Sequence, residues 1–436
     1  MSNILILPTR YYPSISGAEF YIQRIAEILK TVYNYNVDII TSNALDFRAL
    51  RNSRGKIIGK DNAFFSKVND QDIYRLSIEY NDNIEKKMDI VKKNLLDVNL
   101  ELTDECLKRY LENGPFLKSI FETIRNDFQK NYDLIHTTFF PYFNLIVGLW
   151  AGKLFKKPVV CTPFFHFSNP RYLNPYLTEA LKKFDMLIAC TKIEKDFLVK
   201  NYAILDKKVR VIPMGVDLNK FNQKKGDSNS KYYFKQSYFH KKEKKFSMVL
   251  FCGYKNYEKG ALSILKAIPL IIQKKPKVYF TFIGPSTLAF NRELKNLKKH
   301  HNVRIINLTP DNLKGYYDLK KIAAFNETNL FLMPSRSDAY GIAFLEAWAS
   351  SKPVIGSNKG ATPEVINDGV DGMLVKFDDP HDISEKVIKL LRNKKMSKKL
   401  GKAGYFKVKR SNSWEHIAKS THKLYQEIIN NCTSEI

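Results

Sequence analysis

Two carboxylates bracket a glycine-containing segment, Asp338-Ala-Tyr-Gly-Ile-Ala-Phe-Leu-Glu346. If a helix begins near Gly341, Glu346 lies one to two turns inside it and Asp338 lies in the preceding loop. The unbonded amides of Gly341, Ile342 and Ala343 would then face the same space as both acids, and such a helix start attracts phosphate. Carboxylates in turn accept hydrogen bonds from sugar hydroxyls. The segment therefore predicts a site for a nucleotide-sugar, which combines a diphosphate with hydroxyl groups.

An ordinary amphipathic helix with an acidic start would show the same spacing, so the flanking segments matter. Residues 329–335 are typical of a buried strand that ends in a turn, and residues 352–357 of a second short strand. Another helix is predicted to begin within residues 360–366. Strand, polar loop, helix and strand make a βαβ unit, in which ligands collect at the carboxyl ends of the strands. This context favours the ligand site.

Composition limits the class of protein. A chain of 436 residues predicts two or three domains, and a hydrophobic content of 44% is typical of soluble globular proteins. The longest apolar stretch, near 139–150, is too short to span a bilayer, and the first residues predict a strand rather than a leader. The five cysteines form no C-x-x-C pair, which argues against a zinc site or a disulfide framework. We therefore expect a cytoplasmic protein with reduced thiols.

The chain is strongly basic, with 71 Lys and Arg against 44 Asp and Glu and a net charge of +27. Such an excess attracts polyanions or an anionic membrane surface. The densest run of lysines extends from Lys207 to Lys245, although a solvated loop and helix face would explain it equally well. No nucleic-acid-binding motif is present. We expect an anionic membrane surface as a partner and no specific nucleic acid.

Strand-like and helix-like segments alternate along the chain, which predicts open parallel sheets with helices on both faces. The region 46–131 is polar and weakly patterned, with helices expected near 85–93, 104–112 and 118–130, and it is interpreted as a variable surface region. The segment Val209–Asp217 contains Pro213 and Gly215 and suggests a domain boundary. The expected division is 1–208, 209–408 and a C-terminal helix at 409–436. Further strands are predicted at 4–7, 37–41, 134–136, 159–162, 186–190, 246–252, 279–283, 303–306, 330–333 and 353–356.

Several short motifs follow one another in the C-terminal half. They are Val-Ile-Pro-Met-Gly-Val-Asp at 211–217, Gly253 with Lys259-Gly260, Phe282-Ile-Gly284-Pro285, Met333-Pro-Ser-Arg-Ser-Asp338, the Asp338/Glu346 pair, and Gly360-Ala-Thr-Pro-Glu364. In this order they resemble the retaining GT-B glycosyltransferases of the family 4 type (glycosyl transferases group 1). The resemblance implies an α/β fold of two doubly wound Rossmann-like domains that face a deep cleft. It also implies that the last helix, near Trp414 and Tyr425, crosses back onto the N-terminal domain.

The resemblance assigns roles to individual residues on the donor side. Lys259, in the motif that Gly253 opens, would contact the donor diphosphate, although it could also be one surface lysine among many. Glu346 would hold the donor ribose and Asp338 would touch the donor sugar. The helix-start amides at 341–343 would hold the distal phosphate. An ammonium group next to the leaving group makes chemical sense, since it can follow the charge that develops as the glycosidic bond breaks.

The N-terminal half matches the family less completely. Pro13-Ser-Ile-Ser16-Gly17-Ala18-Glu19 resembles the glycine-rich loop near the donor phosphates, but only Gly17 of the usual glycine pair is present, so a plain loop and helix cap remains an alternative. His136 matches the first histidine of a His-x-His motif whose second is missing. It is an acceptor-side candidate or simply packs at a strand end. His166 resembles the family's next histidine and is predicted to be catalytic and to line the acceptor side.

One departure concerns the diphosphate contact. Tyr254 stands where the family usually has an arginine, and Lys255 and Arg336 are the candidates to replace it. The expected reaction moves a hexosyl or related sugar from a nucleoside diphosphate sugar to a hydroxyl of a glycan or lipid-linked glycan. The resemblance implies that the transfer retains the anomeric configuration and needs neither a metal nor another cofactor. We expect it to take place in the cytoplasm or at the inner face of the cell membrane. A non-catalytic nucleotide-sugar-binding paralogue and a basic protein that binds membrane or nucleic-acid surfaces remain as alternatives.

Overall fold

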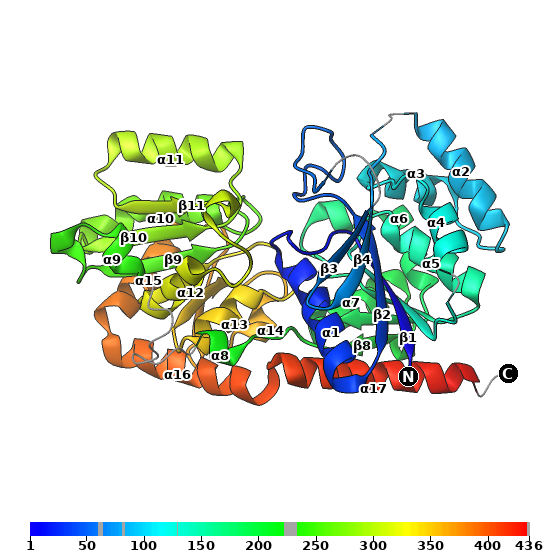
Figure 1. Cartoon of the computed structure of the whole chain (residues 1–436). Helices are drawn as coiled ribbons and strands as arrows, with labels where there is room; N and C mark the ends of the chain where they lie inside the picture. The colour runs from blue at the N-terminus through cyan, green and yellow to red at the C-terminus, as the bar shows by residue number, and fades with distance from the viewer. Residues whose placement is uncertain (60–63, 81–82, 129, 222–232, 434–436) are drawn as a thin grey trace. The chain divides into compact units, whose positions relative to one another are not determined.

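The computed structural model describes residues 1–59, 64–80, 83–128, 130–221 and 233–433. The chain forms two compact units, one made of Met1–Pro213 with Ile417–Ile436 and the other of Met214–His416. Each unit has a largely parallel sheet with helices packed against it (Figure 1). The predicted pair of doubly wound α/β domains is therefore confirmed.

The first unit contains an eight-stranded sheet in the order β3-β4-β2-β1-β5-β6-β7-β8 among the described residues. All neighbouring strands run parallel except β3 and β4, which form an antiparallel pair. The order reverses at β1, because β2 and β5 lie on its two sides, and this makes the carboxyl ends of β1 and β5 a switch point. The strands are β1 (Asn3–Pro8), β2 (Asn36–Ser42), β3 (Phe64–Val68), β4 (Gln71–Leu76), β5 (Leu134–Thr138), β6 (Val159–Thr162), β7 (Met186–Ala189) and β8 (Val209–Val211).

Helices of the described residues pack against this sheet, and three of them lie in the variable region 46–131. Two of the helices expected in that region begin at residues that suit an N-terminal cap: the side chains of Asn83 and Thr103 accept hydrogen bonds from the first-turn amides of α2 and α3. The β3–β4 pair in the same region was not predicted, because β3 has no buried residue and the buried positions of β4 include the polar Gln71 and Arg75. The helices are α1 (Gly17–Tyr33), α2 (Ile84–Leu96), α3 (Asp104–Asn113), α4 (Ile120–Asp127), α5 (Asn144–Phe155), α6 (Pro175–Lys182), α7 (Lys192–Tyr202) and the part of α17 (Trp414–Thr433) from Ile417 onward.

The second unit contains a six-stranded parallel sheet in the order β11-β10-β9-β12-β13-β14 among the described residues. The order reverses at β9, so the loops that follow β9 and β12 lie at the switch point. Strand β11 begins two residues later than the sequence suggested, and β14 was not predicted. The strands are β9 (Ser247–Cys252), β10 (Val278–Ile283), β11 (Ile305–Leu308), β12 (Leu330–Met333), β13 (Val354–Ser357) and β14 (Gly372–Val375).

The boundary between the units differs slightly from the predicted one. Strand β8 pairs with β7, so residues 209–213 belong to the first unit rather than to the second. At the other end, Trp414 packs so closely on Gly215 that a Cβ atom there would lie 2.5 Å from the indole ring, and residues up to His416 stay with the second unit. The helices of this unit are α8 (Leu218–Phe221), α9 (Phe234–Tyr238), α10 (Ala261–Lys274), α11 (Leu288–His300), α12 (Leu319–Glu327), α13 (Ile342–Ala349), α14 (Thr362–Val365), α15 (Pro380–Arg392) and α16 (Lys394–Ser411).

No helix of the described residues is both long and apolar enough to cross a bilayer. The predicted lysine run at 207–245 is described only in part, since residues 222–232 lie outside the described residues. In the described part, Lys235 and Lys244 donate hydrogen bonds to the backbone carbonyls of Phe246 and Gln236. These two lysines are thus engaged locally and do not point freely into solvent.

Candidate active site

The loops at the β9/β12 switch point approach one another very closely. Gly260 has a positive φ of 74°, and a Cβ atom on it would lie 2.2 Å from the carbonyl oxygen of Pro334. Gly284 has a φ of 130°, and a Cβ atom on it would lie 2.1 Å from the carbonyl oxygen of Gly253. Any side chain at Gly260 or Gly284 would push these loops apart. The glycines of the sequence motifs therefore hold together the loops that carry the charged residues.

Lys259 and Asp338 meet at this point, as the sequence analysis predicted that they would share a site. The Lys259 ammonium lies 2.7 Å from a carboxylate oxygen of Asp338. The backbone N–H of Lys259 donates to the side chain of Asn256, which fixes the loop locally. Asp338 is only 8% exposed, whereas Lys259 is partly open to solvent. The pair couples a cation on the β9 loop to an acid on the β12 loop.

The start of α13 provides the predicted helix terminus. Gly341 occupies the N-cap with a positive φ of 92°, and α13 extends from Ile342 to Ala349. Among the described residues, the amides of Gly341, Ile342 and Ala343 find no hydrogen-bond acceptor, while the next amide, that of Phe344, donates to the Gly341 carbonyl. Unbonded donors at a helix start favour an anion.

Glu346 lies inside α13 and is almost completely buried, with 1% of its surface exposed. Its carboxylate is 2.7 Å from the ammonium of Lys321, which comes from α12 and is itself 4% exposed. The Lys321 ammonium also lies 3.6 Å from the centre of the Tyr316 ring. Burial, and next the negative charge of Glu346, raise the pKa of Tyr316 well above its usual value. Glu346 is therefore held by a buried ion pair, and the predicted contact with a donor ribose requires the side chains that cover its carboxylate to move.

Lys321 is a site residue that the sequence analysis missed. In Lys320-Lys321-Ile-Ala-Ala-Phe the two lysines look alike, yet Lys320 is partly solvated and Lys321 points into the core. The apolar residues that follow Lys321 were the available signal, because a helix with that pattern buries the face on which Lys321 lies. A buried lysine needs an acidic partner, and Glu346 is that partner.

The two residues that could replace the missing arginine are both engaged elsewhere. Lys255 is fully buried and donates to the side chain of Asn307, at 2.5 Å, and to the carbonyl of Leu308, at 2.9 Å. Burial lowers the pKa of Lys255 to about 8. Arg336 pairs with Glu258, its Nε lying 3.0 Å from a carboxylate oxygen. Burial removes Lys255 from consideration, whereas Lys259 and Arg336 are both ion-paired and partly exposed. Lys259 is the one whose partner is Asp338.

The corresponding edge of the first unit is held by a buried ion pair. Gly17 begins α1, and the hydroxyl of Ser16 donates to the carboxylate of Glu19. Arg10, on the loop after β1, lies 2.7 Å from Glu19, and both side chains are buried. Gly17 thus lies where predicted, at the β1 end of the switch point, but the charged groups beside it already bind each other.

His136 does not lie where an acceptor could reach it. Its side chain is 0% exposed, and its two ring nitrogens are hydrogen-bonded to Thr162, at 2.9 Å, and to the hydroxyl of Tyr425 on α17, at 2.5 Å. Burial lowers the pKa of His136 to about 3. The prediction of an acceptor-side role does not fit this position, because the residue fastens the last helix to the first sheet.

His166 lies on the loop after β6 and is partly exposed, so it remains a candidate. Its ring packs against Tyr172, with centroids 4.9 Å apart, and lies 6.4 Å from the ring of Phe139. Among the described residues, no group of three or more His, Cys, Asp or Glu side chains is arranged to hold a metal ion. Metal-free transfer stays a prediction.

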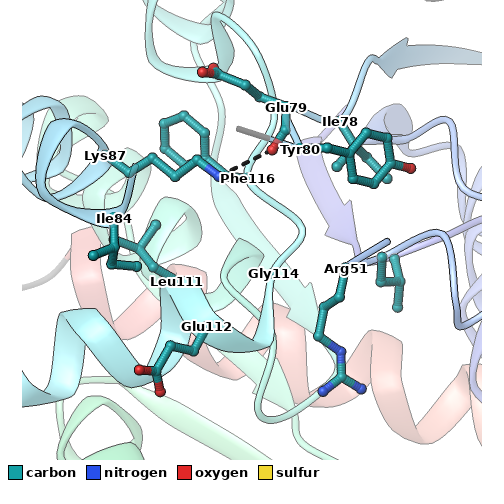
Figure 2. A pocket seen from close by; sticks show the side chains of 11 residues that line it. Arg51, Ile78, Glu79, Tyr80, Ile84, Lys87, Leu111, Glu112, Gly114 and Phe116 are labelled. Atoms are coloured by element: carbon teal, nitrogen blue, oxygen red, sulfur yellow. Dashed lines mark hydrogen bonds between the residues drawn. The ribbon is translucent and has the colours of Figure 1, made fainter. Parts of the chain in front are cut away.

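The variable region contains a pocket of about 250 Å³ (Figure 2). The Lys87 side chain crosses it to reach the carbonyl oxygen of Glu79, and its ammonium lies 5.6 Å from the centre of the Phe116 ring. Arg51 and Glu112 place charged groups at the opposite part of the wall (Figure 2). The remaining lining residues are Leu50, Ile78, Tyr80, Ile84, Leu111 and Gly114.

Comparison with known proteins decides the family. The model "Glycosyltransferase Family 4" matches residues 101–220, and the model "Glycosyl transferases group 1" matches residues 234–407. The chain belongs to the group 1, family 4 type of glycosyltransferases. The second match contains every residue of the β9/β12 site described above.

Similar proteins match this glycosyltransferase over different shares of its length. "Uncharacterized glycosyltransferase MJ1069" of Methanocaldococcus jannaschii is 22% identical over 444 residues, which cover 98% of this chain and 99% of that protein. "Uncharacterized glycosyltransferase MJ1178" of the same organism is 30% identical over 172 residues, covering 39% of this chain and 47% of that protein. Spore coat protein SA of Bacillus subtilis is 22% identical over 79% of this chain and 91% of its own length.

Solved structures confirm the GT-B fold. Sucrose-phosphate synthase from Thermosynechococcus elongatus superposes with a TM-score of 0.71 at 18% identity, covering 99% of this chain and 100% of that one. Anabaena Alr3699/HepE in complex with UDP and glucose superposes with a TM-score of 0.68 at 13% identity, covering 98% and 100%.

Proposed function

We propose that this glycosyltransferase moves a sugar from a nucleoside diphosphate sugar to a hydroxyl of a glycan or lipid-linked glycan, with retention of configuration. The observation that carries the proposal is the Lys259–Asp338 pair beside the unbonded amides at the start of α13. These groups offer a cation and backbone donors to a diphosphate and a carboxylate to sugar hydroxyls. The related structure described as a complex with UDP and glucose supports a donor of this class.

Donor binding would rearrange one ion pair. The α13 amides would donate to the distal phosphate, and the diphosphate charge would draw the Lys259 ammonium away from Asp338. Asp338 would then accept hydrogen bonds from the sugar hydroxyls. Glu346, which Lys321 holds in place, would accept hydrogen bonds from the ribose. The same groups thus bind the donor and prepare the leaving group.

The reaction would break the bond between the anomeric carbon and the diphosphate oxygen. The electron pair leaves with the diphosphate, whose growing charge is stabilised by Lys259 and the α13 amides. The sugar passes through an oxocarbenium-like transition state. The acceptor hydroxyl attacks from the side of the leaving group, and its proton passes to the departing phosphate oxygen. Positive groups of the chain take the role that a metal has in other transferases, so we propose that no metal is required.

The test of this function is a nucleotide-sugar screen followed by a transfer assay. Binding to the folded state raises the melting temperature, so the donor should be the nucleotide-sugar with the largest shift. The selected donor, incubated with candidate hydroxyl acceptors and a chelator, should give a product of the same anomeric configuration, measured by NMR. Inversion, or loss of activity on chelation that added metal restores, would contradict the corresponding part of the proposal.

The pocket of the variable region is our candidate for the acceptor. It combines aromatic and apolar walls with charged groups at its rim, the mixture expected of a site that binds a sugar ring and its polar substituents. Its volume of about 250 Å³ suits one ring rather than a long oligosaccharide. A glycan or lipid-linked glycan would thus present its terminal residue here.

A second candidate function is a protein that binds a nucleotide-sugar without transferring it. It is favoured by Tyr254 in place of the usual arginine and by the position of Lys255, whose ammonium is bonded to Asn307 and Leu308. A donor that binds tightly but is neither hydrolysed nor transferred to any acceptor would support this candidate against the enzyme.

A further inference from the structure

Helix α16 (Lys394–Ser411) has a face with many basic residues and no acidic ones. Seven of its basic side chains are exposed, and the helix contains no Asp or Glu. At 3.6 residues per turn, these seven fall on one arc of about 160°. They are Lys394, Lys395, Lys398, Lys399, Lys402, Lys409 and Arg410.

The opposite face of α16 is packed tightly against α13 and the loop that follows it. A Cβ atom on Gly404 would lie 1.9 Å from the indole of Trp348, and one on Gly401 would lie 2.2 Å from the carbonyl oxygen of Ser351. Such close contacts leave the helix no freedom to rotate about its axis. The basic face is therefore held outward by the core of the second unit.

Pairing distinguishes the two faces of the helix. Lys407, on the inner side, lies 2.8 Å from the carboxylate of Asp371 and is neutralised by it. None of the seven outer cations has a carboxylate partner among the described residues. Their charge is therefore available to an external polyanion. This differs from Lys235 and Lys244 of the lysine run described above, which are bonded to backbone carbonyls.

An aromatic side chain lies on the basic face itself. Phe406 is 54% exposed, and the Lys402 ammonium lies 5.7 Å from its ring centre. Tyr405 neighbours it, with ring centroids 5.8 Å apart. An exposed aromatic ring among long lysine side chains suits the boundary between lipid headgroups and acyl chains, where the ring inserts and the ammonium groups reach the phosphates.

We propose that the outer face of α16 docks on an anionic phospholipid bilayer. The charge complements lipid phosphates, and the ring of Phe406 supplies an apolar contact that a purely electrostatic site would not need. Six of the seven cations are lysines, which attract a charged surface without the bidentate geometry that favours arginine in base recognition. The inference deepens the proposed function, on which it rests for a reason to visit a membrane, because it would bring the enzyme to lipid-linked acceptors.

The test uses the full-length protein and sedimentation with vesicles. Wild type should bind vesicles of phosphatidylglycerol and phosphatidylcholine and should not bind pure phosphatidylcholine. The variant Lys395→Glu/Lys398→Glu/Lys402→Glu should bind anionic vesicles roughly 100-fold or more weakly, since each juxtamembrane cation contributes substantially to binding. Phe406→Ser should lose several-fold in affinity, with most of the loss persisting at high salt, where electrostatic attraction is screened.

A matched control separates this face from net charge. Lys295→Glu/Lys298→Glu/Lys299→Glu, on the exposed surface of α11, changes the total charge by the same amount and should keep vesicle affinity within about twofold of wild type. An equal loss in both triple variants would overturn the proposal, as would tighter binding of wild type to an RNA oligonucleotide than to anionic vesicles.

Donor binding by the same variants separates this inference from the proposed function. The α16 triple variant should keep the wild-type thermal shift with the donor and full transfer to a soluble acceptor, because no substituted residue lies in the β9/β12 site. If wild type binds vesicles through α16 but binds no nucleotide-sugar, the proposed function fails and the docking face stands. If it binds the donor but not anionic vesicles, the docking face fails alone.

Discussion

The two sheets use charged side chains differently at their switch points. In the second unit, the Lys259 ammonium pairs with Asp338 and is partly exposed to solvent. In the first unit, Arg10 and Glu19 are buried against each other, and both ring nitrogens of His136 are bonded inside the core. We propose that the same topological position carries chemistry in the second sheet, whereas in the first sheet it gives structural support. Substitutions at the two edges should separate loss of activity from loss of stability.

The largest effect is expected at the buried Lys321–Glu346 pair, where we expect one group of residues to serve both donor binding and stability. Lys321→Met leaves the Glu346 carboxylate buried without its cation, which should lower the free energy of unfolding by about 3–5 kcal/mol, as measured in urea. The double variant Lys321→Met/Glu346→Leu removes both charges and should regain most of that stability. It should still fail to bind the donor, because no carboxylate remains for the ribose. Normal donor affinity in the double variant would refute the role of Glu346.

Lys259→Ala tests the partly exposed Lys259–Asp338 pair of the second unit. Losing the cation that faces the leaving group should lower the transfer rate by about 10²–10³-fold. The melting temperature should change little, since partly exposed ion pairs contribute about 0–1 kcal/mol. Lys277→Ala is a matched control, because Lys277 is exposed at the amino end of β10, the opposite edge of the same sheet. Similar rates for the two alanine variants would remove Lys259 from the reaction.

His136→Ala tests the buried, hydrogen-bonded histidine of the first unit. The variant loses two buried hydrogen bonds, to Thr162 and Tyr425, and should be destabilised by about 2–3 kcal/mol. The donor-induced thermal shift should persist. A stable variant with impaired acceptor kinetics would instead restore the acceptor-side role that its position argues against.

The pH dependence of stability sharpens the same test. Burial lowers the pKa of His136 in the folded protein from 6.5 to about 3, so the unfolded chain binds more protons between these values. The stabilisation that His136 contributes is therefore complete above pH 6.5 and is lost as the pH falls. Between pH 7 and pH 5 the loss should amount to about 2 kcal/mol relative to a His136→Ala reference, measured by urea unfolding. Parallel curves for the two proteins would contradict a buried neutral imidazole.

The sequence located the charged groups at the edge of the second sheet better than those at the edge of the first, and the reasons are physical. Backbone geometry forces glycine at Gly260 and Gly341, and the βαβ pattern places Lys259 and Asp338 at neighbouring strand ends, so short motifs carry that site. Lys321 was not predicted, since choosing between two adjacent lysines requires weighing the helical periodicity of the apolar residues that follow. The β3–β4 pair and the pocket near Arg51 depend on packing between segments distant in sequence, which no local pattern records.

The smallest effect is expected at the pocket near Arg51. It tests whether the first unit binds the acceptor there. Arg51 is exposed at the pocket wall and has no ion-pair partner among the described residues. Arg51→Ala should therefore leave stability unchanged and raise the acceptor KM about three- to tenfold, since a typical hydrogen bond contributes a net of roughly 0.5–1.5 kcal/mol. The donor KM should not change. Arg54→Ala, an exposed arginine outside the pocket lining, is the control. An unchanged acceptor KM would argue that the acceptor binds elsewhere, and would leave the partly exposed His166 as the better guide to that site.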